Sequence, residues 1–278
     1  MTVTLALVQM RCEKGALDAN LAAMEVSLRA SGERGAEIVC FPEASITGYV
    51  TATTDPDALV AVDGHEVAAF AAMTRGSHLT ALAGIVERNP GGLPYITQIV
   101  ARDGSVLAIY RKLTIPGEES HLYTPGTAAP TVWHHPIRHG APASAPVHSP
   151  LPSRGSGRGW GLPCGTAICA DISNPAVFAR NVAQGARLIF EAAAPGLYGE
   201  QATRDWRAGY AWWRDECHTK LGAYARDFGV TIAVATQAGR TRDEDFPGGG
   251  YVFGPDGACL AESGDWSEGV LYATVDIT

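Results

Sequence analysis

Ile38-Val-Cys-Phe-Pro-Glu43 is a short hydrophobic run that ends in a carboxylate, and two similar runs occur later in the chain. Val106-Leu-Ala-Ile-Tyr-Arg-Lys112 ends in an ammonium group, and Thr166-Ala-Ile-Cys-Ala-Asp171 carries a thiol just before its end. The tip of a buried strand in an α/β protein places its last side chains in the crevice where ligands usually bind. A thiol that meets a cation and a base there can act as a nucleophile. The three runs therefore predict an α/β enzyme.

The composition of the 278 residues is that of an ordinary globular protein, and we expect one domain over residues 1–278. Hydrophobic residues make up 46% and charged residues 18%, which is enough apolar material for a substantial core. The formal net charge of −8, without a basic cluster, argues against a nucleic-acid partner. No apolar run is long enough to cross a bilayer, so we expect no membrane partner.

The amino-terminal segment, residues 1–10, alternates like a strand and begins without a basic region, so a signal peptide is not expected. The six cysteines are scattered and mostly lie inside hydrophobic runs. In a chain of this length, that pattern indicates free thiols in a reducing compartment. We therefore predict a cytoplasmic protein. The cysteines are Cys12, Cys40, Cys164, Cys169, Cys217 and Cys259.

Strand and helix patterns alternate along most of the chain, and Arg102-Asp-Gly marks a hairpin between two strands. Asn174 and Pro175 are typical of a helix start, and Gly35 and Gly229 of helix ends. The pattern favours a four-layer α-β-β-α sandwich, in which helices flank two stacked sheets. Strands are expected at residues 5–9, 37–41, 80–86, 95–101, 105–110, 165–169, 187–190, 230–235, 250–253, 258–262 and 269–275. Helices are expected at residues 16–34, 65–73, from 175 onward, and 203–228.

Residues 136–163 differ from this rhythm because they are rich in Pro, Gly, Ser, Arg and His and have almost no periodicity. We interpret them as a long loop or flap. The flap does not divide the chain into domains, since strands on both sides of it carry the proposed chemistry.

Phe41-Pro-Glu43, Tyr110-Arg-Lys112 and Ile168-Cys-Ala-Asp171, in this order, resemble the nitrilase, or carbon–nitrogen hydrolase, superfamily and its amidase-like branch. The resemblance covers nearly the whole chain. It extends to the opening Ala6-Leu-Val-Gln9, to Tyr123-Thr-Pro-Gly126 and to the closing Tyr251-Val-Phe-Gly-Pro-Asp-Gly257. The resemblance implies that Glu43 is the general base, Lys112 the cationic residue and Cys169 the nucleophile.

These roles agree with elementary chemistry. A free cysteine has a pKa of about 8.5, so Cys169 needs a base such as Glu43 to become nucleophilic at neutral pH. Lys112 and the backbone N–H of Ala170 would stabilise the oxyanion, and water would then cleave the Cys169 thioester. The expected reaction is hydrolysis of a non-peptide C–N bond in a small amide, with water as co-substrate and no cofactor or metal.

A second carboxylate is implied by the resemblance, because relatives often carry a glutamate four residues before an aromatic that leads into Pro-Gly. Glu119 stands four residues before Tyr123 and would position the substrate nitrogen or the lysine. Glu118 beside it leaves this alignment open by one position. The family usually associates, which implies a homodimer or a larger homo-oligomer.

Several departures and alternatives stay open. Thr114 stands where many relatives carry a histidine, and Ile172, Ser173 and Asn174 offer no cation for an anionic N-carbamoyl acid. Ala170 and Asp171 replace the Trp-Glu pair of true nitrilases. The alternatives are a nitrilase acting on C≡N, an N-carbamoyl amidase, acyl transfer to an amine, and a catalytically idle binding protein on the same fold.

Other residues have simpler interpretations. Cys40 and Cys164 are expected to be core thiols, Arg111 structural, and Asp171 a residue that orients the backbone near Cys169 or pairs with an arginine. The spacing of Cys164, Cys169, His134, His135 and His139 matches no zinc pattern. Gly248-Gly-Gly250 is no phosphate loop, because it lacks the following Lys and helix. An aromatic group on the expected long helix is assigned mainly to the core or a subunit interface: Trp206, Tyr210, Trp212 and Trp213.

Overall fold

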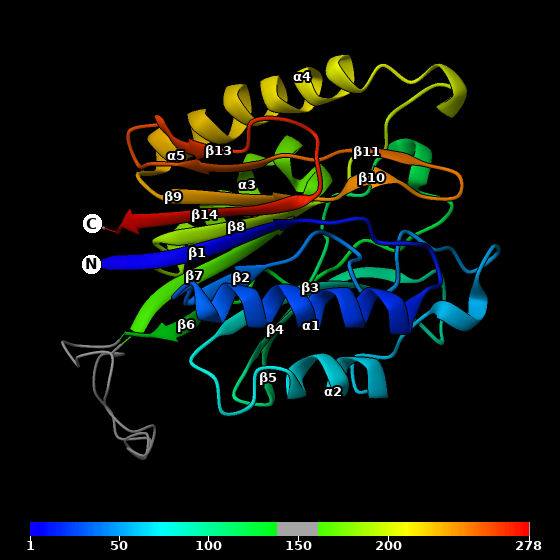
Figure 1. Ribbon diagram of the computed structural model, residues 1–278, viewed down its shortest axis with the longest axis horizontal. Coiled ribbons are helices and arrows are strands. Elements are labelled where there is room, and N and C mark those ends of the chain that lie inside the picture. Colours follow the sequence, from blue (N-terminus) through cyan, green and yellow to red (C-terminus); the bar gives the residue numbers. More distant parts are fainter. Residues whose placement is uncertain (138–160, 278) are drawn as a thin grey trace.

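The computed structural model describes residues 1–137 and 161–277, which form two six-stranded sheets stacked face to face (Figure 1). The first sheet contains β1 (Thr2–Gln9), β2 (Ile38–Cys40), β3 (Thr80–Glu87), β4 (Tyr95–Arg102), β5 (Ser105–Arg111) and β14 (Gly269–Asp276). The second contains β6 (Trp133–Pro136), β7 (Gly161–Ile168), β8 (Leu188–Ala193), β9 (Thr231–Thr236), β12 (Gly250–Phe253) and β13 (Cys259–Glu262). The strand orders are β14-β1-β2-β3-β4-β5 and β13-β12-β9-β8-β7-β6.

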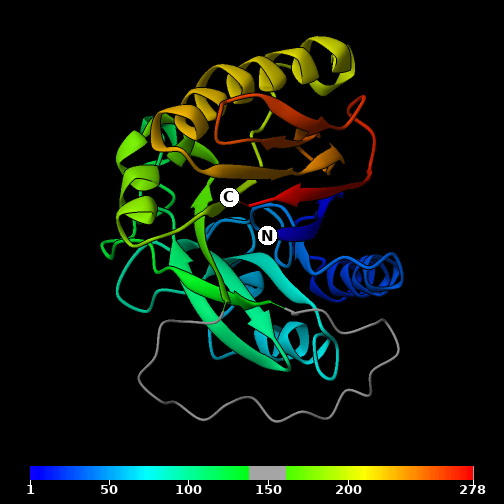
Figure 2. The ribbon, with the colours of Figure 1, turned by 90° about the vertical axis from the view of Figure 1, so that its left-hand side faces the viewer.

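Helices cover the outer faces of both sheets, so the predicted four-layer α-β-β-α sandwich is confirmed (Figure 2). On the first sheet lie α1 (Leu17–Glu33) and α2 (His65–Ala72), and on the second lie α3 (Pro175–Ala183), α4 (Trp206–Glu216) and α5 (Gly222–Phe228). A separate hairpin consists of β10 (Ala238–Arg240) and β11 (Asp245–Pro247).

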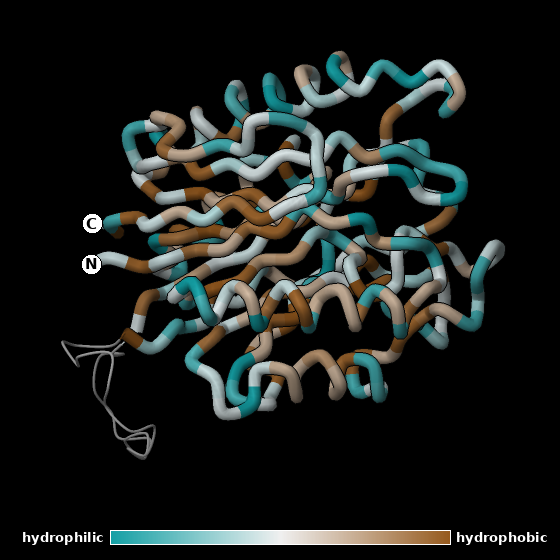
Figure 3. Tube along the Cα trace, viewed as in Figure 1, coloured by the Kyte–Doolittle hydropathy of each residue, from teal (hydrophilic) through white to brown (hydrophobic). Residues whose placement is uncertain are grey.

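The most hydrophobic segments are the central strands, which are buried on both faces (Figure 3). Successive side chains of a strand point to opposite faces, so each strand serves two layers. In β1, Leu5 and Leu7 pack between the two sheets, whereas Ala6 and Val8 pack toward α1. This is why the strand runs read as continuous hydrophobic segments instead of alternating ones.

Most expected elements are present within a few residues of their predicted bounds. The hairpin at Arg102-Asp-Gly joins β4 to β5, and Asp103 (φ 48°) and Gly104 (φ 76°) both adopt the left-handed backbone that such a turn needs. Gly229, with φ 62°, ends α5 as expected.

The predicted bounds of the flap were wrong at both ends. Pro136 ends β6, and Gly161 to Pro163 begin β7, because these two segments pair antiparallel with each other. In β6, Trp133 and His135 are buried and His134 is exposed, which is the alternation of a strand. The strand was not predicted because four residues next to a proline-rich segment give too short a pattern. Residues 138–160, including His139, lie outside the described residues.

The expected helix at 203–228 begins only at Trp206, where Asp205 accepts a hydrogen bond from the backbone N of Ala208 (2.9 Å), and a π-helical turn at Cys217–Leu221 interrupts it. Of the four aromatic residues assigned mainly to the core or a subunit interface, one lies in the core of this chain. Trp213 is buried and donates to Thr236 Oγ1 (2.9 Å), whereas Trp206, Tyr210 and Trp212 retain contact with solvent.

Gly84 in β3 packs directly against the turn that follows β2. A Cβ added at Gly84 would lie 2.2 Å from the backbone N of Ala44 and 2.9 Å from the carbonyl carbon of Glu43. Ala44 itself has a left-handed φ of 51°, and the carbonyl of Gly84 accepts a hydrogen bond from the N–H of Ile46 (2.9 Å). Only a residue without a Cβ therefore lets the turn carrying Glu43 sit against the sheet.

Gly84→Ala should destabilise the protein by about 1–3 kcal/mol, because the added methyl group forces this turn away from β3. Urea unfolding measures the change. Gly264→Ala is the control, since an added Cβ there meets nothing within 4 Å and should change stability by less than about 0.5 kcal/mol. Equal stability of the two variants would contradict the close approach.

Candidate active site

Three strand ends bring Glu43, Lys112 and Cys169 together. Glu43 follows β2 through Phe41 and Pro42, Lys112 follows β5 directly, and Cys169 follows β7. The first two residues come from one sheet and the third from the other. The candidate site therefore lies where corresponding strand ends of the two sheets meet.

Glu43 and Lys112 form a buried ion pair, with 2.8 Å between Lys112 Nζ and Glu43 Oε1. The other carboxylate oxygen, Oε2, accepts a hydrogen bond from the backbone N of Ala194 (2.9 Å), just after β8. Both side chains are almost completely buried, at 0% and 1% exposure. Glu43 is thus fixed by one contact within its own sheet and one from the other sheet.

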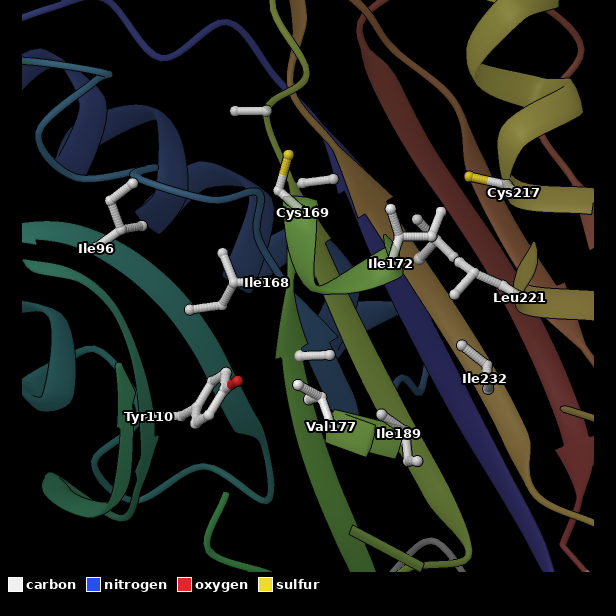
Figure 4. Packing of buried hydrophobic residues seen from close by; sticks show 14 of the residues in the cluster. Ile96, Tyr110, Ile168, Cys169, Ile172, Val177, Ile189, Cys217, Leu221 and Ile232 are labelled. Carbon is white, nitrogen blue, oxygen red and sulfur yellow. The ribbon is translucent and has the colours of Figure 1, made fainter. Parts of the chain in front are cut away.

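Cys169 begins a short 3₁₀ segment at Cys169–Ser173 with a left-handed φ of 44°, which is uncommon for a residue with a side chain. Figure 4 shows its sulfur at the end of β7, directed away from Ile168 and Val177. Only 9% of the residue is exposed, and Glu43 lies within hydrogen-bonding reach of the thiol. Strained backbone of this kind persists only where its surroundings hold it, and it is concentrated at functional sites.

The charges of the three side chains depend on one another. Burial raises the pKa of Cys169 well above its usual value, and the negative charge of Glu43 raises it further, so the thiol is protonated at rest. Burial also raises the pKa of Glu43, although Lys112 opposes this shift. For Lys112, burial favours the neutral form, but Glu43, Cys169 and Glu119 together outweigh it and raise its pKa. The ammonium group therefore keeps its proton.

Glu119 reaches the same region through an aromatic side chain that the sequence analysis missed. Tyr49 donates its hydroxyl to Glu119 Oε2 (2.8 Å), and its ring lies 6.0 Å from Lys112 Nζ. The ring of Tyr49 also packs edge-on against Tyr123, with 5.5 Å between centroids. Glu118 instead accepts a hydrogen bond from Tyr198 at the exposed surface (2.9 Å). Of the two adjacent glutamates, Glu119 is the one on the side of Lys112.

Asp171 connects the turn after Cys169 to the strand end that carries Lys112. Its Oδ2 accepts hydrogen bonds from the Tyr110 hydroxyl (2.7 Å) and the Ile168 backbone N (3.1 Å), and its Oδ1 accepts one from the Thr114 backbone N (2.9 Å). It orients backbone around the cysteine, and among the described residues it pairs with no arginine. Asn174 and Pro175 stand at the start of α3, as expected. The side chain of Asn174 donates to Thr114 Oγ1 (3.1 Å) instead of capping the helix.

Glu191 is a buried residue near the site that the sequence analysis did not identify. It lies in the middle of β8 at 0% exposure, and neither carboxyl oxygen has a hydrogen-bond partner among the described residues. Burial raises its pKa well above the usual value, and the nearby Asp171 and Glu43 raise it further. Glu191 is the one charged residue in the hydrophobic run Leu188–Ala193. A carboxylate inside such a run was the sequence signal that could have identified it.

Other predicted residues lie away from this cluster. All six cysteines are free, and Cys40 and Cys164 are buried core thiols as expected. Arg111 forms an ion pair with Glu87, with 2.7 Å between Nε and Oε2, which confirms its structural assignment. His135 contacts Thr80 Oγ1 through Nδ1 (2.9 Å), and the described residues around it and Cys164 form no cluster that could hold a metal.

Two cavities flank this region, and Cys169 lines neither of them. One, of about 440 Å³, is lined by residues of the segment after β8 and the start of α4, including Leu197, Tyr198 and Trp212. The other, of about 320 Å³, is lined by residues that include Thr114 and Tyr123. Within residues 1–137 and 161–277, no helix is both long and apolar enough to cross a membrane.

Comparison with known proteins agrees with this architecture. Residues 4–278 match the family model of carbon-nitrogen hydrolases, and the chain therefore belongs to that family, as its motifs predicted. The fold is shared with an amidase of Nesterenkonia AN1 from the nitrilase superfamily, with a TM-score of 0.75 and 22% identity over 98% of this chain and 90% of the amidase. A second structure of that amidase, with a TM-score of 0.72, 21% identity and coverage of 98% of this chain and 90% of its own, shows covalent addition of the acetamide moiety of fluoroacetamide at its active-site cysteine.

Curated relatives are similar over only part of their length. A formamidase of Allorhizobium ampelinum is 34% identical over 92 residues, which are 33% of this chain and 27% of the formamidase. A glutamine-dependent NAD(+) synthetase of Thermotoga maritima is 23% identical over 290 residues, which cover 100% of this chain and 42% of the synthetase. The matched region thus spans less than half of these proteins.

Glu191→Gln should make the free energy of unfolding less dependent on pH. The folded protein keeps Glu191 protonated, whereas the unfolded chain releases this proton near the ordinary pKa of 4.5. As the pH rises above that value, the unfolded state of the unchanged protein gains stability by about 1.4 kcal/mol per pH unit until the folded-state pKa is reached. The glutamine side chain of the variant has no proton to release, so the free energy of unfolding of Glu191→Gln should exceed that of the unchanged protein by an amount that grows with pH.

Urea unfolding at a series of pH values between 5 and 8 measures the effect. The control is Glu25→Gln on the exposed face of α1, for which no such divergence is expected. Parallel pH curves for Glu191→Gln and the unchanged protein would show that Glu191 is ionised in the folded state.

Proposed function

We propose that this protein hydrolyses the C–N bond of a small amide through a thioester on Cys169, with Glu43 as the base and Lys112 as the oxyanion partner. The observation that carries the proposal is the convergence of a protonated thiol, a carboxylate of raised pKa and a permanent cation in one buried site. A base is most effective when its pKa lies close to the working pH, so the raised pKa of Glu43 suits this role.

In the first half of the reaction, Cys169 Sγ attacks the amide carbon while its proton passes to Glu43. The carbonyl oxygen becomes an oxyanion, which Lys112 Nζ and the backbone N–H of Ala170 stabilise. The intermediate then collapses, the C–N bond breaks, and Glu43 returns the proton to the departing nitrogen. Ammonia or an amine leaves, and the acyl group remains on the sulfur as a thioester.

Water completes the cycle. Glu43, again a carboxylate, takes a proton from a water molecule that attacks the thioester carbon. The C–S bond breaks, the carboxylic acid leaves, and Cys169 recovers its proton from Glu43. Glu119 holds Tyr49 beside Lys112 and so keeps the ammonium group oriented. The scheme balances without a cofactor or metal.

A small amide is favoured as substrate by two comparisons. The local similarity to formamidases and the fold shared with an amidase both concern amide hydrolysis. The covalent acetamide adduct on that amidase's cysteine is the kind of modification expected if Cys169 is a nucleophile. A nitrile-hydrolysing enzyme is the second candidate within this scheme, because the same thiol could attack a C≡N carbon.

Cys169→Ala should reduce kcat for a small amide such as formamide or acetamide by at least about 10⁴-fold, because no other group can form the acyl intermediate. Ammonia release measures turnover, and thermal unfolding verifies the fold. Cys12→Ala removes another buried thiol, which the mechanism does not use, and should retain activity. Undiminished turnover in Cys169→Ala would refute the mechanism, and direct conversion of the matching nitrile to the acid would favour the nitrilase alternative.

The rate constant kcat/KM should fall at acid pH with a midpoint above 4.5, the ordinary pKa of a glutamate, because activity requires ionised Glu43 and burial raises its pKa. The measurement is a pH–rate profile under conditions in which the protein remains folded. A midpoint at or below 4.5 would exclude Glu43 as the base.

A further inference from the structure

A second cluster of reactive side chains lies apart from Cys169, at the edge strand of the second sheet. His218, Cys259 and Glu262 each offer one ligand atom, and these three atoms lie within 4.8 Å of one another. Cys259 and Glu262 belong to β13, which β12, β9 and β8 separate from β7 in the sheet order. The mechanism above uses none of the three.

A β-bulge places Cys259 and Glu262 on the same face of β13. Residues three apart on a regular strand point to opposite faces. Here Tyr251 is opposite Glu262 and Phe253 is opposite Cys259, so one residue of β13 is unpaired between them. Because opposing residues share a face, the thiol and the carboxylate both lie on the side of Tyr251 and Phe253.

The third ligand group is the imidazole of His218, which lies in the π-helical turn packed on the same face of the sheet. His218 lies in the turn Cys217–Leu221, and its ring packs edge-on against Tyr251 (5.9 Å between centroids) and Phe253 (5.2 Å). The α4 and α5 helices lie over β13 and β9 in both ribbon views (Figure 1, Figure 2). Bulges and π-turns are each frequent at functional sites, and here the two irregularities meet.

Two neighbouring side chains hold the carboxylate of Glu262 in place beside the imidazole of His218. His218 Nε2 lies 2.9 Å from Glu262 Oε2, and Arg214 donates to both oxygens of Glu262 at 3.0 Å. An ion bound between Oε2 and the imidazole nitrogen would replace the bond from Arg214 Nε, while the bond from Arg214 Nη2 to Oε1 would remain and orient the carboxylate. The side chains of His218 and Glu262 are 28% and 37% exposed, which leaves an entry path from solvent.

We propose that His218, Cys259 and Glu262 bind one divalent transition-metal ion, of which Zn²⁺ fits the ligands best. Zinc takes thiolate, imidazole and carboxylate ligands in a tetrahedral arrangement, and three protein ligands leave the fourth position to water. Mg²⁺ and Ca²⁺ prefer oxygen ligands throughout and do not match a thiol and an imidazole. The bound ion would tie the edge strand β13 to the π-turn, and Cys259 would release its proton on binding.

The test is titration of the metal-free full-length protein with Zn²⁺ and with Co²⁺, carried out in the Cys169→Ala background so that the site thiol cannot bind the ion. We expect one equivalent to bind, with a thiolate-to-cobalt charge-transfer band and proton release. Cys259→Ser should abolish the band, and His218→Gln should weaken binding at least about tenfold. Zn²⁺ should raise the Tm of the Cys169→Ala protein but not that of its Cys259→Ser derivative.

The matched control is His65→Gln, which removes an exposed histidine that also contacts a carboxylate, Glu66, at 3.2 Å. It should leave binding unchanged. Absence of saturation near one equivalent, absence of the thiolate band, or equal affinity in Cys259→Ser would overturn the proposal.

Discussion

The buried ion pair between Glu43 and Lys112 is the interaction on which the rest of the site depends. Removing two charges from water is costly, and the cost is recovered only with good geometry and further hydrogen bonds. Lys112 is the only buried lysine or arginine among residues 1–137 and 161–277, and Glu43 gains its further bond from the backbone of Ala194. Since Ala194 directly follows β8 of the opposite sheet, the pair is satisfied only when both sheets are assembled. Folding and formation of the site are therefore one event.

Asp171 couples this pair to the thiol. Tyr110 and Thr114 lie two residues before and two residues after Lys112, and both donate to the Asp171 carboxylate. Asp171 in turn lies two residues after Cys169 and accepts from the backbone just before it. The strained turn at Cys169 is thus held by the same strand end that presents the ammonium group. A displacement of either segment would move the sulfur and the cation together, which preserves their relative position.

The sequence was sufficient to predict the layers and the three convergent strand ends, because hydrophobic runs and their terminal residues are local signals. What it could not predict depends on contacts between distant segments. Tyr49 lies in an irregular segment, and only its contacts with Glu119 and Lys112 in the folded chain identify it as a site residue. The strand β6 is defined by its pairing with β7, and the face shared by Cys259 and Glu262 depends on a bulge that no periodicity reveals. Glu191 was visible as a carboxylate in a hydrophobic run, but its isolation follows only from the packing around it.

Buried acids outnumber the cationic side chain of Lys112 at the site. Glu43, Asp171 and Glu191 are all buried, and burial raises the pKa of each, while Lys112 opposes the shift in all three. One ammonium group cannot neutralise three carboxylates, so a neutral Glu191 leaves Glu43 and Asp171 to share its charge. This arrangement costs stability, as strained or unsatisfied groups at functional sites generally do. In return, Lys112 stays protonated and Glu43 becomes a stronger base than an exposed glutamate, which is the combination that a protonated thiol requires.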